Sequence, residues 1–115
     1  MNQLALPLTK PTPVVIVTQV LSAHRGAANG ISAKALALAC LITERAVREA
    51  ITALRMDGVG VAGTPETGYF LADSAAELEP TLQFIRSRAM TSLVLEARLR
   101  KVALPDLIGQ LRVPT

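Results

Sequence analysis

The chain has 115 residues, 50% hydrophobic and 18% charged, which suits one compact domain and excludes both a disordered chain and two full domains. Its longest uninterrupted apolar run, Ala35–Ile42, is far shorter than the roughly 20 residues of a membrane-spanning helix, despite a mean hydropathy of +0.40. The net charge of +3 is unevenly distributed, because residues 56–80 carry only acidic charges and the flanking segments are basic.

Residues 1–12 predict an extended arm, because prolines stand among polar residues there. The pair Thr12-Pro13 predicts the start of a first helix over 13–25, since threonine caps helix amides and proline suits the first helical position. Gly26 would end this helix, and a turn would follow over 27–30. The inner face of the helix would carry Val14, Val17, Val20 and Leu21.

Two further helices follow, with a very short connection between them. Ser32 caps a predicted helix over 33–40, and Thr43 caps one over 44–57. The connection at 41–43 has the length typical of a helix-turn-helix. The residues expected to face inward are Leu36, Ala39 and Cys40 in the first of these helices and Val47, Ala50, Ile51 and Leu54 in the second.

The rest of the chain predicts a hairpin and then helix. Two short β-prone runs within residues 59–72 flank a tip of glycine, proline and threonine, which favours a β-hairpin. A capping pair at 73–74 predicts a further helix, and Pro80 implies either a short turn before a longer helix or a kink. Apolar residues recur at helical spacing over 81–103, and prolines predict an irregular tail over 105–115.

The fold class expected from this order is mainly α with a small β-hairpin, an α+β arrangement that ends in a long C-terminal helix. The predicted organisation is an extended arm (1–12), a helix-turn-helix and hairpin domain (13–72), a C-terminal helical segment for dimerisation (73–104) and an irregular tail (105–115).

Four stretches carry a resemblance to a known family, namely ISAKALA (31–37), ITERAVREAI (42–51), LRMDG (54–58) and GYFLA (68–72). They are similar to winged-helix DNA-binding domains of the biotin-repressor type, as in small bacterial or prophage-encoded regulators. The resemblance covers residues 13–72 well and continues loosely to residue 89. It implies a winged helix-turn-helix fold and a sequence-specific, double-stranded DNA-binding transcriptional regulator.

The helix predicted over 44–57 would read the major groove. Arg45 and Arg48 stand one turn apart on its outward face, near the N-terminal half that recognition helices insert. Arginine donates two parallel hydrogen bonds to guanine, and short hydroxyls and lysine suit phosphate oxygens. The expected DNA-binding residues are Ser32, Lys34, Thr43, Glu44, Arg45, Arg48, Glu49, Thr52 and Arg55.

Other interpretations of these residues stay open. The two arginines also stand four residues from glutamates, so they could form solvated ion pairs worth roughly a few tenths of a kcal/mol. Leu41 occupies a turn position that is usually glycine in the resembling proteins, so it would be strained or take a different turn. The predicted hairpin tip carries Glu66 and no basic residue, so we expect no strong contact with phosphate. The alternative function is a winged-helix module for protein–protein interaction or scaffolding, without a DNA target.

The C-terminal helix is apolar over more than one stripe, so it must bury more than one side. We expect part of it to pack on the first helix and the hairpin, and the remainder to form a homodimer. A helix that packs only within its own chain is the alternative. The expected dimerisation residues are Leu82, Ile85, Ala89, Leu93, Leu99 and Val102.

Catalysis has little support in the sequence. The one histidine, His24, is expected to meet carbonyls at the end of the first helix or to cap the following turn, and the one cysteine, Cys40, is expected in the core. Without paired carboxylates, a phosphate loop or a metal-ligand set, we predict no enzyme activity, no cofactor, no metal and no small-molecule ligand. The N-terminus lacks the pattern of a secretory signal and the one cysteine fits a reducing cytosol, so we expect a cytoplasmic protein. The expected DNA binding would make it nucleoid-associated, and we expect no membrane contact.

Overall fold

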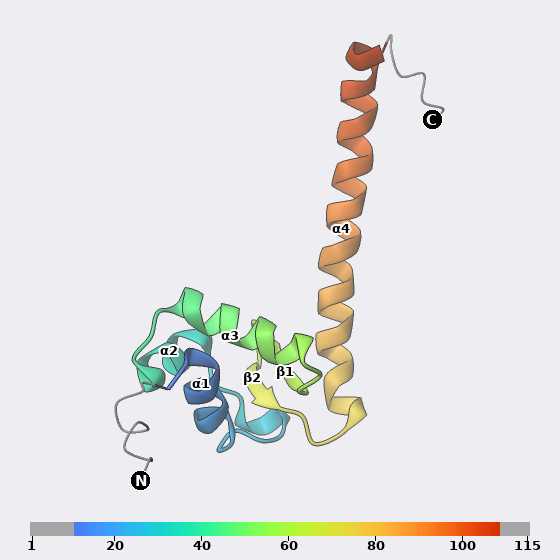
Figure 1. The fold of residues 1–115 in the computed structure, drawn as a ribbon. Coiled ribbons are helices and arrows are strands. Elements are labelled where there is room, and N and C mark those ends of the chain that lie inside the picture. The colour runs from blue at the N-terminus through green and yellow to red at the C-terminus, as the bar shows by residue number, and fades with distance from the viewer. Residues whose placement is uncertain (1–10, 109–115) are drawn as a thin grey trace. The chain divides into compact units, whose positions relative to one another are not determined.

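The computed structural model describes residues 11–108, with the backbone alone over 102–108. The chain divides into two compact units, one ending at Thr81 and the other beginning at Leu82. The predicted fold class, mainly α with a small β-hairpin and a long C-terminal helix, is confirmed. In chain order the elements are α1 (Pro13–Leu21), the 3-10 helix η2 (Ala27–Asn29), α2 (Ala33–Cys40), α3 (Glu44–Met56), β1 (Val61–Thr64), β2 (Gly68–Leu71) and α4 (Ala75–Ile108) (Figure 1).

The first helix is shorter than predicted, because α1 ends at Leu21 and not at Arg25. After a final turn the chain leaves the helix, since Arg25 forms a backbone bridge with Leu71 of β2. Gly26, which was expected to end α1, precedes η2 and has φ +88°, a left-handed conformation that glycine adopts without steric cost. The last turn of the predicted helix is therefore replaced by an extended segment at Arg25, which pairs with β2.

The core of the first unit lies among the three short helices and the hairpin. The predicted inner face of α3 is confirmed, and Val17 and Leu21 of α1 are fully buried. In α2 the prediction for Ala39 is wrong, because Ala39 is exposed and Ala37 is buried beside Leu36. The buried hydrophobic residues are Val17, Leu21, Leu36, Ala37, Cys40, Val47, Ala50, Ile51, Leu54, Val61, Ala62 and Phe70, with Val14 and Val20 half-buried beside them.

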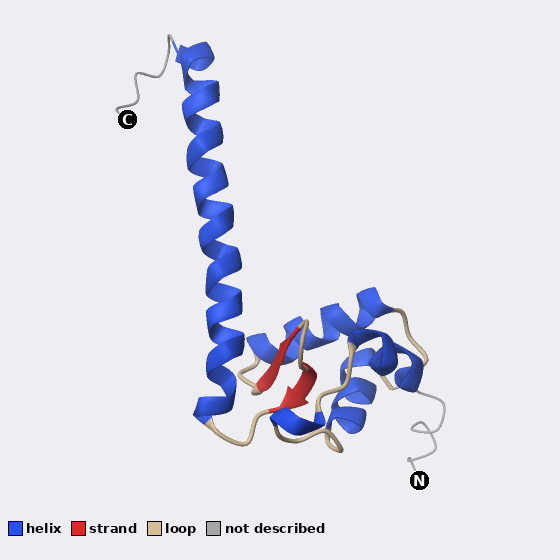
Figure 2. Ribbon diagram, turned by 180° about the vertical axis from the view of Figure 1, so that it is seen from behind, coloured by secondary structure: helices blue, strands red, loops and turns tan. Residues whose placement is uncertain are grey.

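β1 and β2 form an antiparallel hairpin (Figure 2), and the second edge of β2 is paired as well. Ile31 and Tyr69 exchange two backbone hydrogen bonds, each of 2.8 Å. The close approach of this segment to the hairpin requires glycine at position 30, because a Cβ at Gly30 would lie 1.9 Å from the carbonyl oxygen of Thr67. The segment before α2 thus fixes the hairpin against the helices.

The connection between α2 and α3 turns at Leu41, whose φ of 58° and ψ of 42° are left-handed. It is the only residue other than glycine with positive φ in the described part of the chain. This conformation costs a residue with a Cβ roughly 1–2 kcal/mol. Of the two expectations for Leu41, the strained turn is therefore confirmed. The side chain is 90% exposed, so burial does not offset the strain.

α4 begins with reciprocal capping. The Oγ of Ser74 accepts from the N–H of Glu77 at 3.3 Å, and the Glu77 carboxylate accepts from the N–H of Asp73 at 2.8 Å. The helix continues through Pro80, so the short turn separated from a longer helix is not formed. Proline lacks the N–H that would donate to the carbonyl of Ala76, four residues before it, so the helix lacks one hydrogen bond there.

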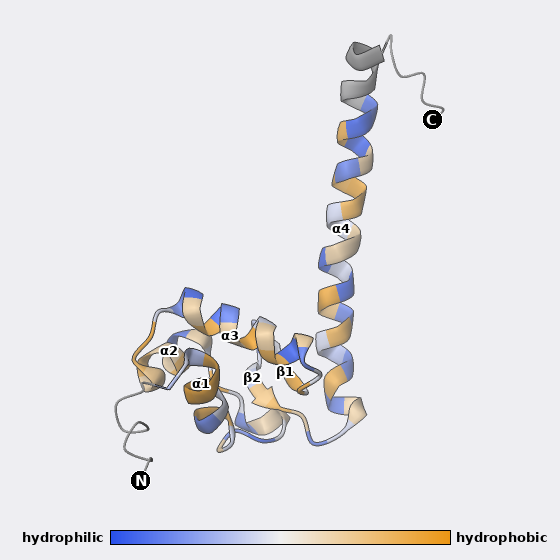
Figure 3. Ribbon diagram, viewed as in Figure 1, coloured by the Kyte–Doolittle hydropathy of each residue, from blue (hydrophilic) through white to orange (hydrophobic). Residues whose placement is uncertain are grey.

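α4 also ends later than predicted. It runs to Ile108, so the predicted irregular tail is wrong for 105–108, and the remaining tail residues and residues 1–10 of the predicted arm lie outside the described residues. Over 82–101 every side chain is exposed except Phe84, which is half-buried. Figure 3 shows hydrophobic and hydrophilic residues in alternation along this segment. No helix within the described range combines the length and apolarity needed to cross a membrane.

Candidate nucleic-acid interface

α3 has one face in the core and the opposite face in solvent. The four charged residues of the exposed face lie in the first half of the helix, and Thr52 and Met56 complete it toward the C-terminal end. Met56 is 81% exposed and is a surface residue that the sequence prediction omitted. Its spacing of four residues from Thr52 is the signal that could have placed it there. The exposed face consists of Glu44, Arg45, Arg48, Glu49, Thr52 and Met56.

Each arginine of this face is paired with a glutamate one turn away. Nη2 of Arg48 lies 3.3 Å from Oε1 of Glu44, and Nε of Arg45 lies 3.4 Å from Oε2 of Glu49. The arginine side chains are 59% and 87% exposed, respectively. Exposed helical pairs of this kind contribute about 0.3–0.5 kcal/mol, so each arginine can leave its glutamate at low cost when a better acceptor is offered. The ion-pair interpretation is thus correct for the free protein.

Ser32 and Thr43 cap the helices on either side of the turn. The Oγ of Ser32 accepts from the N–H of Ala35 at 3.1 Å, and Oγ1 of Thr43 accepts from the N–H of Ala46 at 3.0 Å. Both residues are exposed, and each hydroxyl retains a hydrogen that can be donated outward. Lys34 is exposed in the first turn of α2. These helix starts can therefore offer donors and positive dipole ends to an anion.

Arg55 was expected among the DNA-binding residues of this helix, but it does not belong to the exposed face of α3. It is half-buried, its Nε donates to the carbonyl of Val61 at 2.8 Å, and its guanidinium lies 5.9 Å from the ring centroid of Tyr69. Burial lowers the pKa of Arg55, and its Nη2 is buried without a described hydrogen-bond partner. These contacts make Arg55 a link between α3 and the hairpin.

The hairpin tip is held by its own hydrogen bonds. The N–H of Thr64 donates to Oγ1 of Thr67 at 3.1 Å, and the hydroxyl of Thr64 donates to Glu66 at 3.4 Å. The tip therefore presents hydroxyls and one carboxylate, and no basic residue occurs over 56–80. A phosphate would find no positive side chain on this loop.

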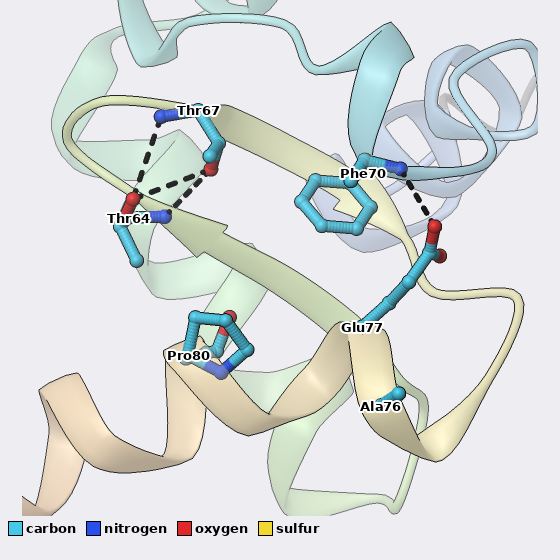
Figure 4. Close-up of a pocket in the computed structure, with 8 residues that line it drawn as sticks. Thr64, Thr67, Phe70, Ala76, Glu77 and Pro80 are labelled. Carbon is cyan, nitrogen blue, oxygen red and sulfur yellow. Dashed lines mark hydrogen bonds between the residues drawn. The ribbon is translucent and has the colours of Figure 1, made fainter.

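A cavity of about 300 Å³ lies between the hairpin and the first turns of α4 (Figure 4). Two of the polar groups that line it already accept hydrogen bonds from the backbone. The Glu77 carboxylate accepts from the N–H of Ala27 at 3.1 Å, and Oγ1 of the buried Thr81 accepts from the N–H of Gly63 at 2.8 Å. The remaining walls are mainly apolar. The two hydrogen bonds stabilise the junction between the hairpin and the first turns of α4. The lining residues are Ala27, Thr64, Thr67, Phe70, Ala76, Glu77, Pro80 and Thr81.

The histidine and the cysteine both have local structural contacts. Nδ1 of His24 lies 2.8 Å from the carbonyl oxygen of Asn29, so the ring caps the turn after α1, as one of the two expectations stated. Cys40 is buried in the core as predicted, and burial raises the pKa of its thiol. A thiol with a raised pKa forms less of the reactive thiolate.

The expected dimerisation residues are all exposed where their side chains are described, and Val102 lies outside that part. At 3.6 residues per turn, one side of α4 carries the first four residues of the expected set, which are Leu82, Ile85, Ala89 and Leu93. Leu99 lies roughly 120° around the helix from Leu93, so the expected set does not form one stripe. Other large apolar side chains exposed on α4 are Met90, Val94 and Leu95.

Comparison with known proteins found no matching family model, no similar curated protein and no similar solved structure. The function is therefore inferred from the chain's own residues and geometry.

Proposed function

We propose that this protein is a sequence-specific double-stranded DNA-binding protein, a transcriptional regulator that reads the major groove with α3. The observation that carries the proposal is the exposed polar face of α3, from which Arg45 and Arg48 project while the opposite face is held in the core. A recognition helix needs this division, because its side chains must reach base edges while the helix stays rigid.

We further propose that residues 13–72 are a winged helix-turn-helix domain. Three features support this: the short turn between α2 and α3, the left-handed backbone at Leu41, and the pairing of β2 with both β1 and Ile31. In this arrangement the exposed Ser32, Lys34 and Thr43 would position the domain on phosphates, which fixes its register without reading sequence. Arg55 is excluded from the contact set, because it is bonded to β1.

The proposed active form is a cytoplasmic, nucleoid-associated homodimer joined through α4. Its support is the row of exposed apolar side chains on α4, which includes Leu82, Ile85 and Leu93 at 50%, 44% and 56% exposure. Most of the stability of a helix comes from packing of its apolar side chains, which a partner helix would supply here. Two copies of α3 would then occupy two half-sites on one duplex.

The test begins with selection of bound sites from a random duplex library, followed by affinity measurements on the selected duplex. Arg45→Ala and Arg48→Ala should each weaken binding by about 1–3 kcal/mol with unchanged folding, because each removes a donor to a base edge. Arg100→Ala is the matched control, since Arg100 forms the same type of pair with Glu96, at 2.8 Å, on α4. Wild-type affinity of both α3 variants at matched salt would refute the role of α3.

A protein–protein interaction module is the second candidate function. The acidic segment 56–80 and the exposed apolar residues of α4 favour it, because neither attracts a polyanion. Absence of any duplex binding at low salt would support this candidate, since nearly all proteins that bind DNA do so through salt-sensitive phosphate contacts.

A further inference from the structure

The exposed face of α3 carries no net charge. Its two arginines are matched by two glutamates, and both pairs are formed, at 3.3 and 3.4 Å. All four side chains are at least 45% exposed, so the pairs can open toward solvent. Thr43 caps the N-terminus of the helix, so neither glutamate serves as its cap. The two glutamates flank the two arginines that would contact DNA, so each of these arginines meets a carboxylate before it meets a base or a phosphate.

Glutamate has opposite effects at phosphates and at bases. Non-specific binding comes almost entirely from attraction between basic side chains and phosphates, which a neighbouring carboxylate opposes. At a base edge the carboxylate has a suitable partner, because it accepts from the amino group N4 of cytosine. An arginine released by its glutamate donates to O6 and N7 of guanine. A site with both guanine and cytosine thus satisfies both members of a pair, whereas the phosphate backbone satisfies only one.

We propose that Glu44 and Glu49 are specificity-determining residues, whose negative charge disfavours contacts of Arg48 and Arg45 with phosphates and whose carboxylates accept from cytosine at G·C-containing sites. This inference rests on the proposed function of α3. It assigns the two carboxylates to discrimination between sequences, and the two arginines to affinity at the correct site.

The experiment compares wild type with Glu44→Gln and Glu49→Gln on two probes, the selected duplex and a random-sequence duplex of equal length, over a range of salt concentrations. Each substitution should strengthen binding to the random duplex. The slope of log K against log salt should become more negative by about 0.9, which corresponds to one added phosphate contact. The ratio of affinities for the selected and random duplexes should fall roughly tenfold, as for the loss of one base contact. G·C pairs should be enriched in the selected sites.

Glu96→Gln is the matched control. It removes a glutamate from the pair with Arg100 on α4 and changes the net charge by the same amount. An equal gain for this variant would show that only net charge matters and would overturn the inference, as would an unchanged affinity ratio in both α3 variants. Neither of those results would argue against DNA binding by α3. If wild type binds neither duplex, the proposed function itself fails and the inference fails with it.

Discussion

Leu41 shows at the scale of one residue how a turn can be formed at an energetic cost. Its left-handed backbone would be unstrained for glycine, and its 90% exposed side chain has little packing to lose. We predict that Leu41→Gly raises the free energy of unfolding by about 0.5–1 kcal/mol, the strain of roughly 1–2 kcal/mol less the entropy cost of glycine. The urea midpoint measures this change.

Leu38→Gly is the comparison for that variant. Leu38 is also exposed, at 70%, but it lies inside α2, where glycine costs about 1 kcal/mol of helix stability. The two substitutions should therefore move the midpoint in opposite directions. A loss of stability in Leu41→Gly would show that its side chain makes a stabilising contact.

At the scale of elements, the start of α4 is held to the hairpin by one buried hydroxyl. Thr81 is 3% exposed, and its Oγ1 is the acceptor for the N–H of Gly63 on the edge of β1. We predict that Thr81→Val lowers the free energy of unfolding by about 1–3 kcal/mol, because it leaves that N–H buried without an acceptor. Thr81→Ser keeps the accepting oxygen, so its free energy of unfolding should fall less than that of Thr81→Val. Denaturant melts of the two variants compare them directly, and equal stability of Thr81→Val and wild type would contradict the role.

Glu77 makes the same junction sensitive to pH. The pKa of its carboxyl is lowered because the carboxylate accepts from the N–H groups of Asp73 and Ala27. The folded state therefore favours the ionised form. Its stabilising contribution is complete above the ordinary pKa of 4.5 and is lost as the pH falls through the lower value of the folded state.

We predict that Glu77→Gln is less stable than wild type at pH 7 and that this difference disappears as the pH falls below 4.5. Urea midpoints of both proteins between pH 7 and pH 3 measure the difference. Glu66→Gln is the control, because the described hydrogen bond of Glu66 comes from a hydroxyl, that of Thr64. A difference that is the same at every pH would mean that glutamine disturbs the junction by its shape alone.

The sequence predicted the elements better than their ends and contacts. Capping residues and apolar spacing located α2 and α3, and β-prone runs around a turn-forming tip located the hairpin, because these signals lie within each segment. The end of α1 and the contacts of Arg55 could not be found in this way, since both depend on strand residues that lie outside the helix concerned. For the candidate site, the sequence identified the charged face of α3. It could not separate Arg55 from that face, because helical spacing does not reveal which nearby carbonyl an arginine meets.

At the scale of the whole molecule, the apolar surface of α4 should determine the oligomeric state. We predict that the protein sediments as a dimer and that Leu93→Glu shifts it toward monomer, because a carboxylate is costly to bury in an apolar interface. Leu95→Glu is the matched control, since Leu95 is equally exposed, at 56%, and lies on nearly the opposite side of the helix. A wild-type mass equal to the monomer at all concentrations would exclude the dimer, and dissociation by both variants would indicate contacts on more than one side.

The pairing of Ile31 with Tyr69 has a consequence for the order of folding. The two residues are separated in the chain by α2, α3 and β1, so their contact closes a long loop, whereas the contacts among neighbouring helices close short ones. We expect the helices to associate first and the segment at Ile31 to join the hairpin late. Weakening this pairing should then accelerate unfolding and leave the folding rate nearly unchanged.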